Sequence, residues 1–119
     1  MPFTAILRDL TQKTHSTGAV MLDHDGELVA SYSSFPSLEI DLIGAHHGII
    51  LNSIKDFSSR RQDLSGVKSV SISTTMMKLA ISAIKDGYYL VLTMDRIRPI
   101  GKALYESQKA VKKIEAEMG

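Results

Sequence analysis

The stretch SLEIDLIGAHHGIILNSIKDF, residues 37–57, decides how the rest of the chain is arranged. Wound as a helix at about 100° per residue, it carries apolar side chains around most of its circumference. They form two adjoining sectors and a smaller third patch: Leu38, Leu42, Ala45 and Ile49; Ile43, Ile50, Ile54 and Phe57; and Ile40 with Leu51. A surface helix of a lone domain usually shows one apolar stripe. The sequence therefore predicts a helix that needs a second molecule to cover part of its surface.

Length and composition fit one small globular unit. The 119 residues, with 14 Lys and Arg against 13 Asp and Glu, predict a single domain over residues 1–119 with a formal charge of +1. That balance favours neither nucleic acid nor an anionic membrane as a partner. The chain has no Cys, which fits a reducing compartment, and its first 15 residues lack the pattern of a signal peptide. We expect a soluble, cytoplasmic protein.

Two Asp-Gly dipeptides mark predicted hairpin turns. Asp25-Gly26 separates two β-rich runs, and Asp86-Gly87 separates two more. Asp and Gly tolerate the positive φ angles of tight turns, so each pair of runs is expected to fold back on itself. A further run alternates apolar residues with serines, which is the period of a strand with one dry face. The five strands are expected at residues 19–22, 28–32, 68–75, 78–85 and 88–94. The last of these is apolar on both faces, as a central strand would be.

Two terminal helices complete the predicted set. Apolar residues recur at helical spacing near the N-terminus, where Thr4 is a candidate cap, and the polar residues 14–18 end that helix. Pro99 suits the first turn of the last helix, which has one apolar and one charged face. The order helix, two strands, helix, three strands, helix predicts an α+β fold with a five-stranded antiparallel sheet. The terminal helices would cover one face and the middle helix the other.

No pattern in the chain predicts catalysis or a cofactor. His46 and His47 are adjacent and point about 100° apart on a helix, so they cannot easily share a metal ion. The acidic residues around Gly26 lack the twelve-residue calcium pattern and are explained by a turn. No G-x-S-x-G or glycine-rich phosphate loop is present in the sequence. We therefore expect no catalytic, cofactor-binding or metal-binding residues.

Two features of the middle stretch indicate contact with another protein. Gly44 and Gly48 are four residues apart, and glycine costs about 1 kcal/mol against alanine inside a helix, so close approach of another backbone would explain them. Arg60 and Arg61, with Lys55, form a small basic cluster at the end of the predicted helix. Such clusters are usually solvated, but this one could meet an acidic partner.

The order of these elements resembles the roadblock, or dynein light-chain, family over nearly the whole chain. The matching features are GAVMLDHDGELVAS as the first hairpin, the long helix after the Ser-Pro break, and KLAISAIKDGYYLVLTMD followed by the terminal helix. The resemblance implies a profilin-like, roadblock-type fold. It also implies homodimers or heterodimers in which middle helices pack side by side and third strands join two sheets into one.

Stand-alone prokaryotic members of this family resemble the mutual gliding-motility regulator. That resemblance implies a homodimer that binds a Ras-like small GTPase across its paired middle helices and promotes GTP hydrolysis without supplying a catalytic residue. For this chain we expect the dimer interface at Ile40, Gly44, His47, Gly48, Leu51, Val70 and Ile72. The surface facing the GTPase is expected at Asp41, Asn52, Lys55, Arg60 and Arg61.

Two other functions stay open on the sequence alone. One is a non-catalytic adaptor that dimerises to tether larger proteins, as scaffold members of the family do. The other is a small-molecule sensor, which the apparently filled sheet faces make less favoured. Nucleotide dependence of partner binding would separate the regulator from the adaptor, and a ligand-sized cavity lined by Leu, Met and Tyr would favour the sensor.

Overall fold

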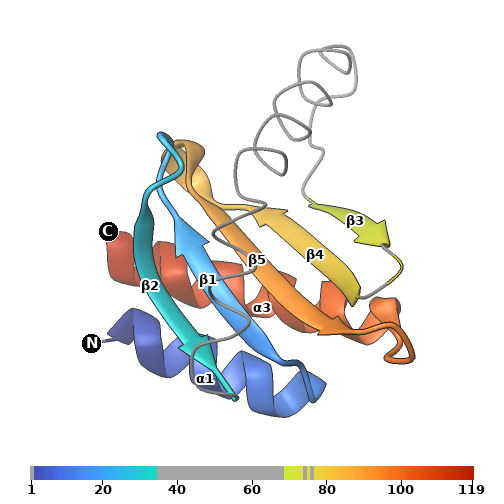
Figure 1. Cartoon of the computed structure of the whole chain (residues 1–119). Helices are drawn as coiled ribbons and strands as arrows, with labels where there is room; N and C mark the ends of the chain where they lie inside the picture. Colours follow the sequence, from blue (N-terminus) through green and yellow to red (C-terminus); the bar gives the residue numbers. More distant parts are fainter. Residues whose placement is uncertain (1, 35–68, 74, 76) are drawn as a thin grey trace.

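A computed structural model describes residues 2–34, 69–73, 75 and 77–119 of the chain (Figure 1). Its elements are α1 (Pro2–Thr14), β1 (Gly18–Leu22), β2 (Leu28–Ser33), β3 (Ser69–Ser73), β4 (Met77–Ala83), the 3-10 turn η1 (Lys85–Gly87), β5 (Tyr89–Asp95) and α3 (Ile100–Met118). The helix predicted over residues 37–57 and the loop predicted over residues 58–66 lie outside the described residues.

The described strands form one antiparallel sheet in the order β2-β1-β5-β4-β3. β5 lies in the middle, and its residues from Leu90 to Met94 are all buried. A strand buried on both faces needs apolar residues at consecutive positions rather than at alternate ones. The continuous apolar run in β5 therefore placed it correctly as the central strand. The α+β class and the five-stranded antiparallel sheet are confirmed.

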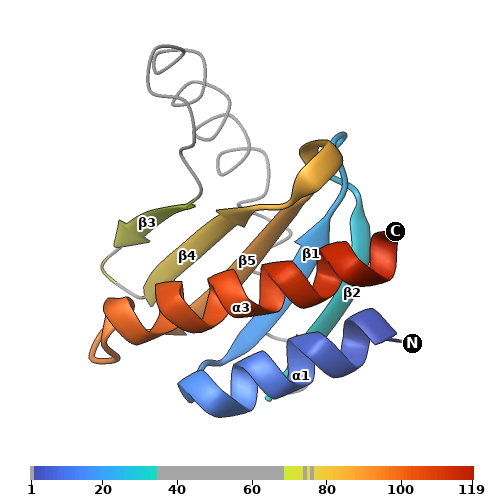
Figure 2. The same ribbon diagram turned by 180° about the vertical axis from the view of Figure 1, so that it is seen from behind.

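α1 and α3 lie side by side across one face of the sheet (Figure 2). Their apolar stripes pack on the side chains that alternate strand residues point toward them. The buried core on this face includes Leu7, Leu10, Met21, Leu90, Leu92 and Ile114. Each of these side chains is at most 2% exposed, and full burial of one contributes about 2 kcal/mol. Both terminal helices thus cover the same face, as predicted.

Both hairpin turns use the backbone conformations that the Asp-Gly dipeptides favour. Gly26 has a φ of 85°, and its N–H donates to the Asp23 carbonyl over 2.9 Å. Asp86 and Gly87 have φ values of 62° and 79°, as a two-residue turn with two left-handed positions requires. The register places both turns at the same end of the sheet, because Leu22 of β1 pairs with Tyr89 of β5.

Two helix starts differ from the sequence prediction. α1 begins at Pro2, so Thr4 is an exposed residue inside the helix and not its cap. Proline suits a first turn because its missing N–H has no partner there in any case. α3 begins at Ile100, and Pro99 stands one residue ahead of it with an extended ψ of 127°. In both cases the prediction was wrong by one or two residues, at positions where helix ends are hard to fix.

Candidate protein-interaction surface

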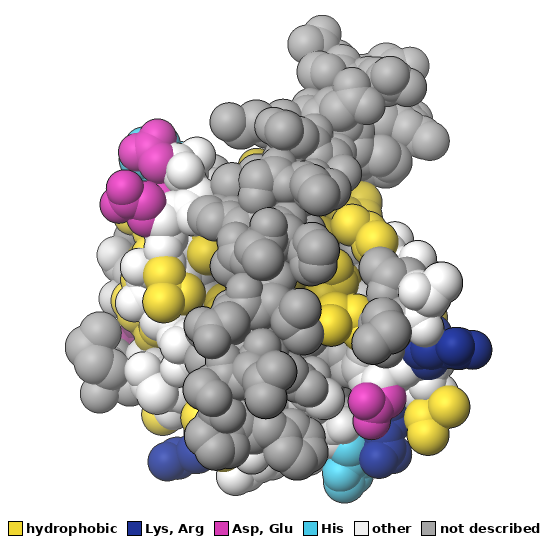
Figure 3. Space-filling view, viewed as in Figure 1, with side chains coloured by type: hydrophobic (Ala, Val, Ile, Leu, Met, Phe, Trp, Pro, Cys, Tyr) yellow, Lys and Arg dark blue, Asp and Glu magenta, His cyan; other side chains and the backbone are white. Residues whose placement is uncertain are grey.

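The sheet face opposite α1 and α3 is apolar in the described strands. Its buried residues are Val20, Leu22, Leu79, Ile81 and Val91, with Val70, Ile72, Met77 and Tyr89 partly buried beside them. These residues come from β1, β3, β4 and β5, and they share a face because side chains alternate along each strand. Figure 3 looks onto this side of the molecule and shows hydrophobic side chains between polar margins. An apolar face of this kind is suited to packing against another surface.

β3 forms an edge of the sheet next to this face. Within the described residues β3 pairs only with β4, with Val70 opposite Ile81 and Ile72 opposite Leu79. Val70 and Ile72 are half-buried, whereas Ser71 and Ser73 on the other face are exposed. β3 contains no proline or charged residue, the usual features that prevent an edge strand from pairing with another chain. The structure therefore brings these two predicted interface residues together on an edge suited to strand addition.

The remaining predicted interface residues cannot be placed. Ile40, Gly44, His47, Gly48 and Leu51, and the surface expected to face a GTPase, Asp41, Asn52, Lys55, Arg60 and Arg61, all lie outside the described residues. Their proposed roles stay predictions. Val70 and Ile72 are the members of that set for which the structure supplies positions.

A pair of buried threonines, which no sequence pattern indicated, joins the start of β1 to β5. The Thr17 hydroxyl lies 2.8 Å from the Thr93 hydroxyl and donates to the Thr93 carbonyl over 3.0 Å. The Thr17 carbonyl in turn accepts the backbone N–H of Ser34 over 2.9 Å. These bonds tie the start of β1 to β5 and to the end of β2. Two threonines separated by 76 positions give no local sequence signal, so only the sheet register reveals the pair.

The Asp23 turn shows the geometry of a hairpin and no ligand set. Asp23 Oδ1 accepts the backbone N–H groups of Asp25 and Glu27, each over 2.9 Å. The hydrogen bond from Glu27 is the main cause that lowers the pKa of Asp23 below its usual value. In the described part of the chain no three His, Cys, Asp or Glu side chains are grouped so that they could hold a metal ion. The turn explanation of these acidic residues is sufficient.

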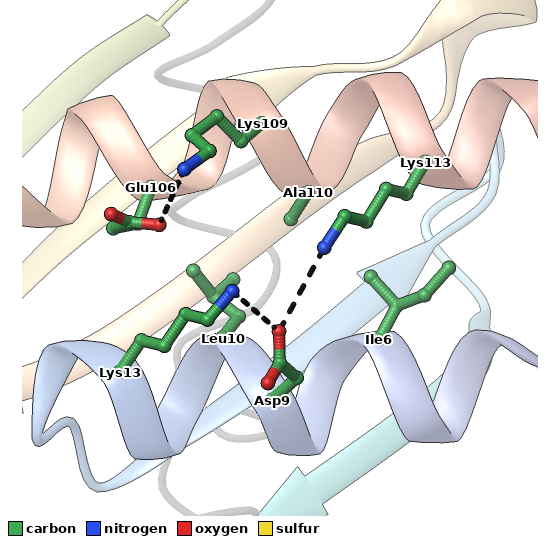
Figure 4. A pocket seen from close by; sticks show the side chains of 8 residues that line it. All are labelled: Ile6, Asp9, Leu10, Lys13, Glu106, Lys109, Ala110 and Lys113. Carbon is green, nitrogen blue, oxygen red and sulfur yellow. Dashed lines mark ion pairs between the residues drawn. The ribbon is translucent and has the colours of Figure 1, made fainter.

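A small pocket lies between α1 and α3, on the far side of the sheet (Figure 4). Ile6, Leu10 and Ala110 form its apolar floor. Asp9 bridges the helices at its rim, with Lys13 Nζ at 3.0 Å and Lys113 Nζ at 3.9 Å. The hydrogen bond from Lys13 is the main cause that lowers the pKa of Asp9. The pocket encloses about 10 Å³, room for one water, and is not the ligand-sized cavity that a sensor would need.

Comparisons with known proteins find similarity in structure rather than in sequence. No protein-family model matches the chain, and no curated protein sequence matches it. The solved structure of MglB from Myxococcus xanthus superposes with a TM-score of 0.81 at 12% identity, covering 98% of this chain and 94% of that one. A roadblock/LC7 domain from Streptomyces avermitilis superposes with a TM-score of 0.76 at 22% identity, covering 97% and 96%.

The chain has a roadblock-type fold. A third solved structure, described as MglB with a tetrameric arrangement, superposes on this roadblock-type chain with a TM-score of 0.83 at 15% identity, covering 96% and 85%. The predicted resemblance to the roadblock fold and to MglB is thereby confirmed. Among the described residues, no helix of this roadblock-type chain has the length and hydrophobicity needed to cross a membrane.

Proposed function

We propose that this chain is a cytoplasmic, homodimeric regulator that binds a Ras-like small GTPase and stimulates its GTP hydrolysis without contributing a catalytic residue. The main support is β3, an uncharged edge strand whose Val70 and Ile72 continue the apolar face of the sheet. The roadblock-type fold, the similarity to MglB and the description of one MglB as a tetramer support an assembling protein. The surplus apolar surface predicted for residues 37–57 supports the same conclusion.

In this proposal the dimer forms in two places. β3 strands of two copies pair edge to edge, extending the sheet through Val70 and Ile72. The middle stretch packs on its own copy through Ile40, Gly44, His47, Gly48 and Leu51. The GTPase then contacts Asp41, Asn52, Lys55, Arg60 and Arg61. Its active conformation is bound more tightly than the inactive one, which shifts the population of the GTPase toward the state that hydrolyses GTP.

The edge contact can be tested at Ser71, the middle residue of β3. In a symmetric antiparallel pair of β3 strands, this position lies near its own copy, so like charges there repel. We expect Ser71→Glu and Ser71→Lys each to be monomeric by light scattering, and a mixture of the two to form a heterodimer. Thr4→Glu, on the exposed side of α1, serves as the control and stays dimeric. Dimeric Ser71→Glu protein would contradict pairing through β3.

The regulatory role is tested with the Ras-like GTPases of the same organism. We expect the dimer to bind a GTP-loaded GTPase and not the GDP-loaded form, and to raise the hydrolysis rate. Arg60→Ala with Arg61→Ala should weaken binding but leave the hydrolysis rate at saturation unchanged, because the arginines act by charge attraction and not as arginine fingers. Neither a complex nor faster hydrolysis with any such GTPase would refute the proposal.

The second candidate function is an adaptor that dimerises in order to tether larger proteins. The same open β3 edge favours it, because strand addition can join different chains as well as identical ones. An adaptor would bind its partner equally well whichever nucleotide is present. The comparison of GTP-loaded and GDP-loaded partners therefore separates the two functions.

A further inference from the structure

Among the described residues, the two ends of the sheet carry side chains of opposite charge. Antiparallel pairing places the β1–β2 turn and η1 at one end, and the β5–α3 turn with the start of β4 at the other. In the view of Figure 3, Asp and Glu side chains gather at the upper left, where Figure 1 shows the β1–β2 turn, and Lys and Arg side chains lie at the lower right beside an acidic side chain and a His. Charge is therefore separated along the strands, although the whole chain is close to neutral.

The acidic end is built from two neighbouring turns. Asp23 accepts two backbone hydrogen bonds from its own turn, and the His24 ring lies tilted by 48° to the Tyr88 ring with centroids 6.5 Å apart. A Cβ on Gly87 would lie 3.1 Å from the His24 Cβ, so the two turns are in close contact. Among the described residues of this end, Lys85 faces a group of acidic side chains: Asp23, Asp25, Glu27, Asp86 and Glu115, whose Oε2 accepts the Lys85 backbone N–H over 2.9 Å.

The basic end is held by hydrogen bonds in a similar way. The N–H of Arg98 donates to the Asp95 carbonyl over 3.2 Å and closes the turn. Arg96 Nη1 donates to the Thr75 carbonyl over 3.1 Å, and Lys78 Nζ donates to the Arg98 carbonyl over 3.1 Å. Basic residues therefore outnumber acidic ones among the described residues of this end. The basic residues are Lys78, Arg96, Arg98 and Lys102, and the acidic residue is Asp95.

Each end also exposes one large aliphatic side chain. Ile97, at the tip of the basic turn, is 85% exposed, and Leu28, which follows the acidic turn, is 57% exposed. Turn tips usually carry Gly, Pro, Asn, Asp or Ser, and nothing in the geometry of the Asp95–Arg98 turn requires an isoleucine. The two ends are therefore complementary. Each has an exposed apolar side chain, and the charged residues of one end are opposite in sign to those of the other.

We propose that the acidic end of one copy binds the basic end of the next, with Ile97 packed beside Leu28. The occupant of each end is therefore a second copy of this chain, chosen by charge complementarity. Such a contact is heterologous, since it joins different surfaces, and it can repeat into assemblies larger than a dimer. It involves none of the residues proposed for pairing through β3 or for contact with a GTPase, so it is tested separately from the proposed function.

The test measures the mass of the full chain by sedimentation velocity over a range of concentrations. At an ionic strength of about 0.05 M we expect species larger than a dimer, growing with concentration. At about 0.5 M the screening length is about threefold shorter and those species should dissociate. Failure to exceed a dimer at low salt, or assembly unaffected by salt, would overturn the proposal.

Charge reversal identifies the contact. Arg96→Glu with Lys102→Glu makes both ends acidic, and Asp25→Lys with Glu27→Lys makes both ends basic. Each double variant alone should therefore stay at the mass that the unaltered chain has at high salt. An equimolar mixture should assemble again, which also shows that both variants are folded. Arg8→Glu with Lys112→Glu, on exposed helix positions, is the matched control and should assemble as the unaltered chain does. Loss of assembly in that control, or no recovery in the mixture, refutes end-to-end binding.

Discussion

The Thr17 hydroxyl lies 2.8 Å from the Thr93 hydroxyl, both in the buried interior of the sheet. Thr93→Val keeps the shape of the side chain and removes its hydroxyl, which also approaches the Gly18 carbonyl at 3.3 Å. We expect the free energy of unfolding to fall by about 1 kcal/mol, the usual net value of one hydrogen bond. Urea denaturation measures it. Thr93→Ser retains the hydroxyl and serves as the comparison; a Val variant as stable as the original protein would contradict the prediction.

Ser107 shows the opposite situation. Its hydroxyl is fully buried between α3 and the sheet and has no hydrogen-bond partner among the described residues. Ser107→Ala removes an unsatisfied polar group and introduces a better helix former, so the free energy of unfolding should rise by about 1 kcal/mol. Thermal denaturation measures the gain. Thr11→Val is the control, because the Thr11 hydroxyl donates to the Leu7 carbonyl over 2.8 Å and its loss should give no gain.

Two glycines should respond in opposite directions to replacement by alanine. Gly87 has a φ of +79° and a site where a Cβ would lie 3.1 Å from that of His24, so Gly87→Ala should destabilise the fold by at least about 1 kcal/mol. Gly101 lies in α3, and in the part of the chain that the structure describes no atom lies within 4 Å of an added Cβ. Gly101→Ala should stabilise by up to about 1 kcal/mol, since alanine is the better helix former. Differential scanning calorimetry measures the melting temperature of both variants, which should fall for Gly87→Ala and rise for Gly101→Ala. A change of the same sign in both would refute this explanation.

The acidic turn predicts a specific pH dependence. The folded state lowers the pKa of Asp23 below its usual value of 3.8, chiefly through the N–H of Glu27. The ionised carboxylate therefore stabilises the fold fully above pH 3.8, and that contribution is lost as the pH falls through the lowered pKa. Asp23→Asn keeps an oxygen acceptor without the charge. We expect it to be less stable than the original chain at pH 7 and equally stable at the acid end of the titration, by denaturant midpoints; a gap that is constant with pH would exclude the charge as the cause.

The sequence was informative where the signal is local. Asp25-Gly26 and Asp86-Gly87 predicted both hairpins, and these hairpins then determined which strands are neighbours. Alternation placed Val70 and Ile72 on one face of β3, as the structure confirms. The unbroken apolar run in β5 indicated its central place in the sheet. Each of these inferences needs residues no more than a few positions apart.

Features that depend on distant residues were not predictable. Thr17 and Thr93 meet only because β1 pairs with β5, and the contact of His24 with the second turn depends on the same register. The separation of charge between the two ends of the sheet likewise emerges only after five strands are aligned. The start of α1 at Pro2 escaped prediction because the Thr4 pattern is equally compatible with a cap and with a helical position.

The position of β3 at the edge of the described sheet has a consequence for aggregation of this chain. Edge strands of natural sheets usually contain a lysine, a proline or a bulge that prevents pairing with another chain. Ser69–Ser73 contains no lysine or proline, and its register with β4 shows no bulge. A β3 strand that stays unpaired would offer a template on which further chains could stack into fibrous aggregates. A second copy of the chain that pairs with β3, as proposed above, would also remove this template.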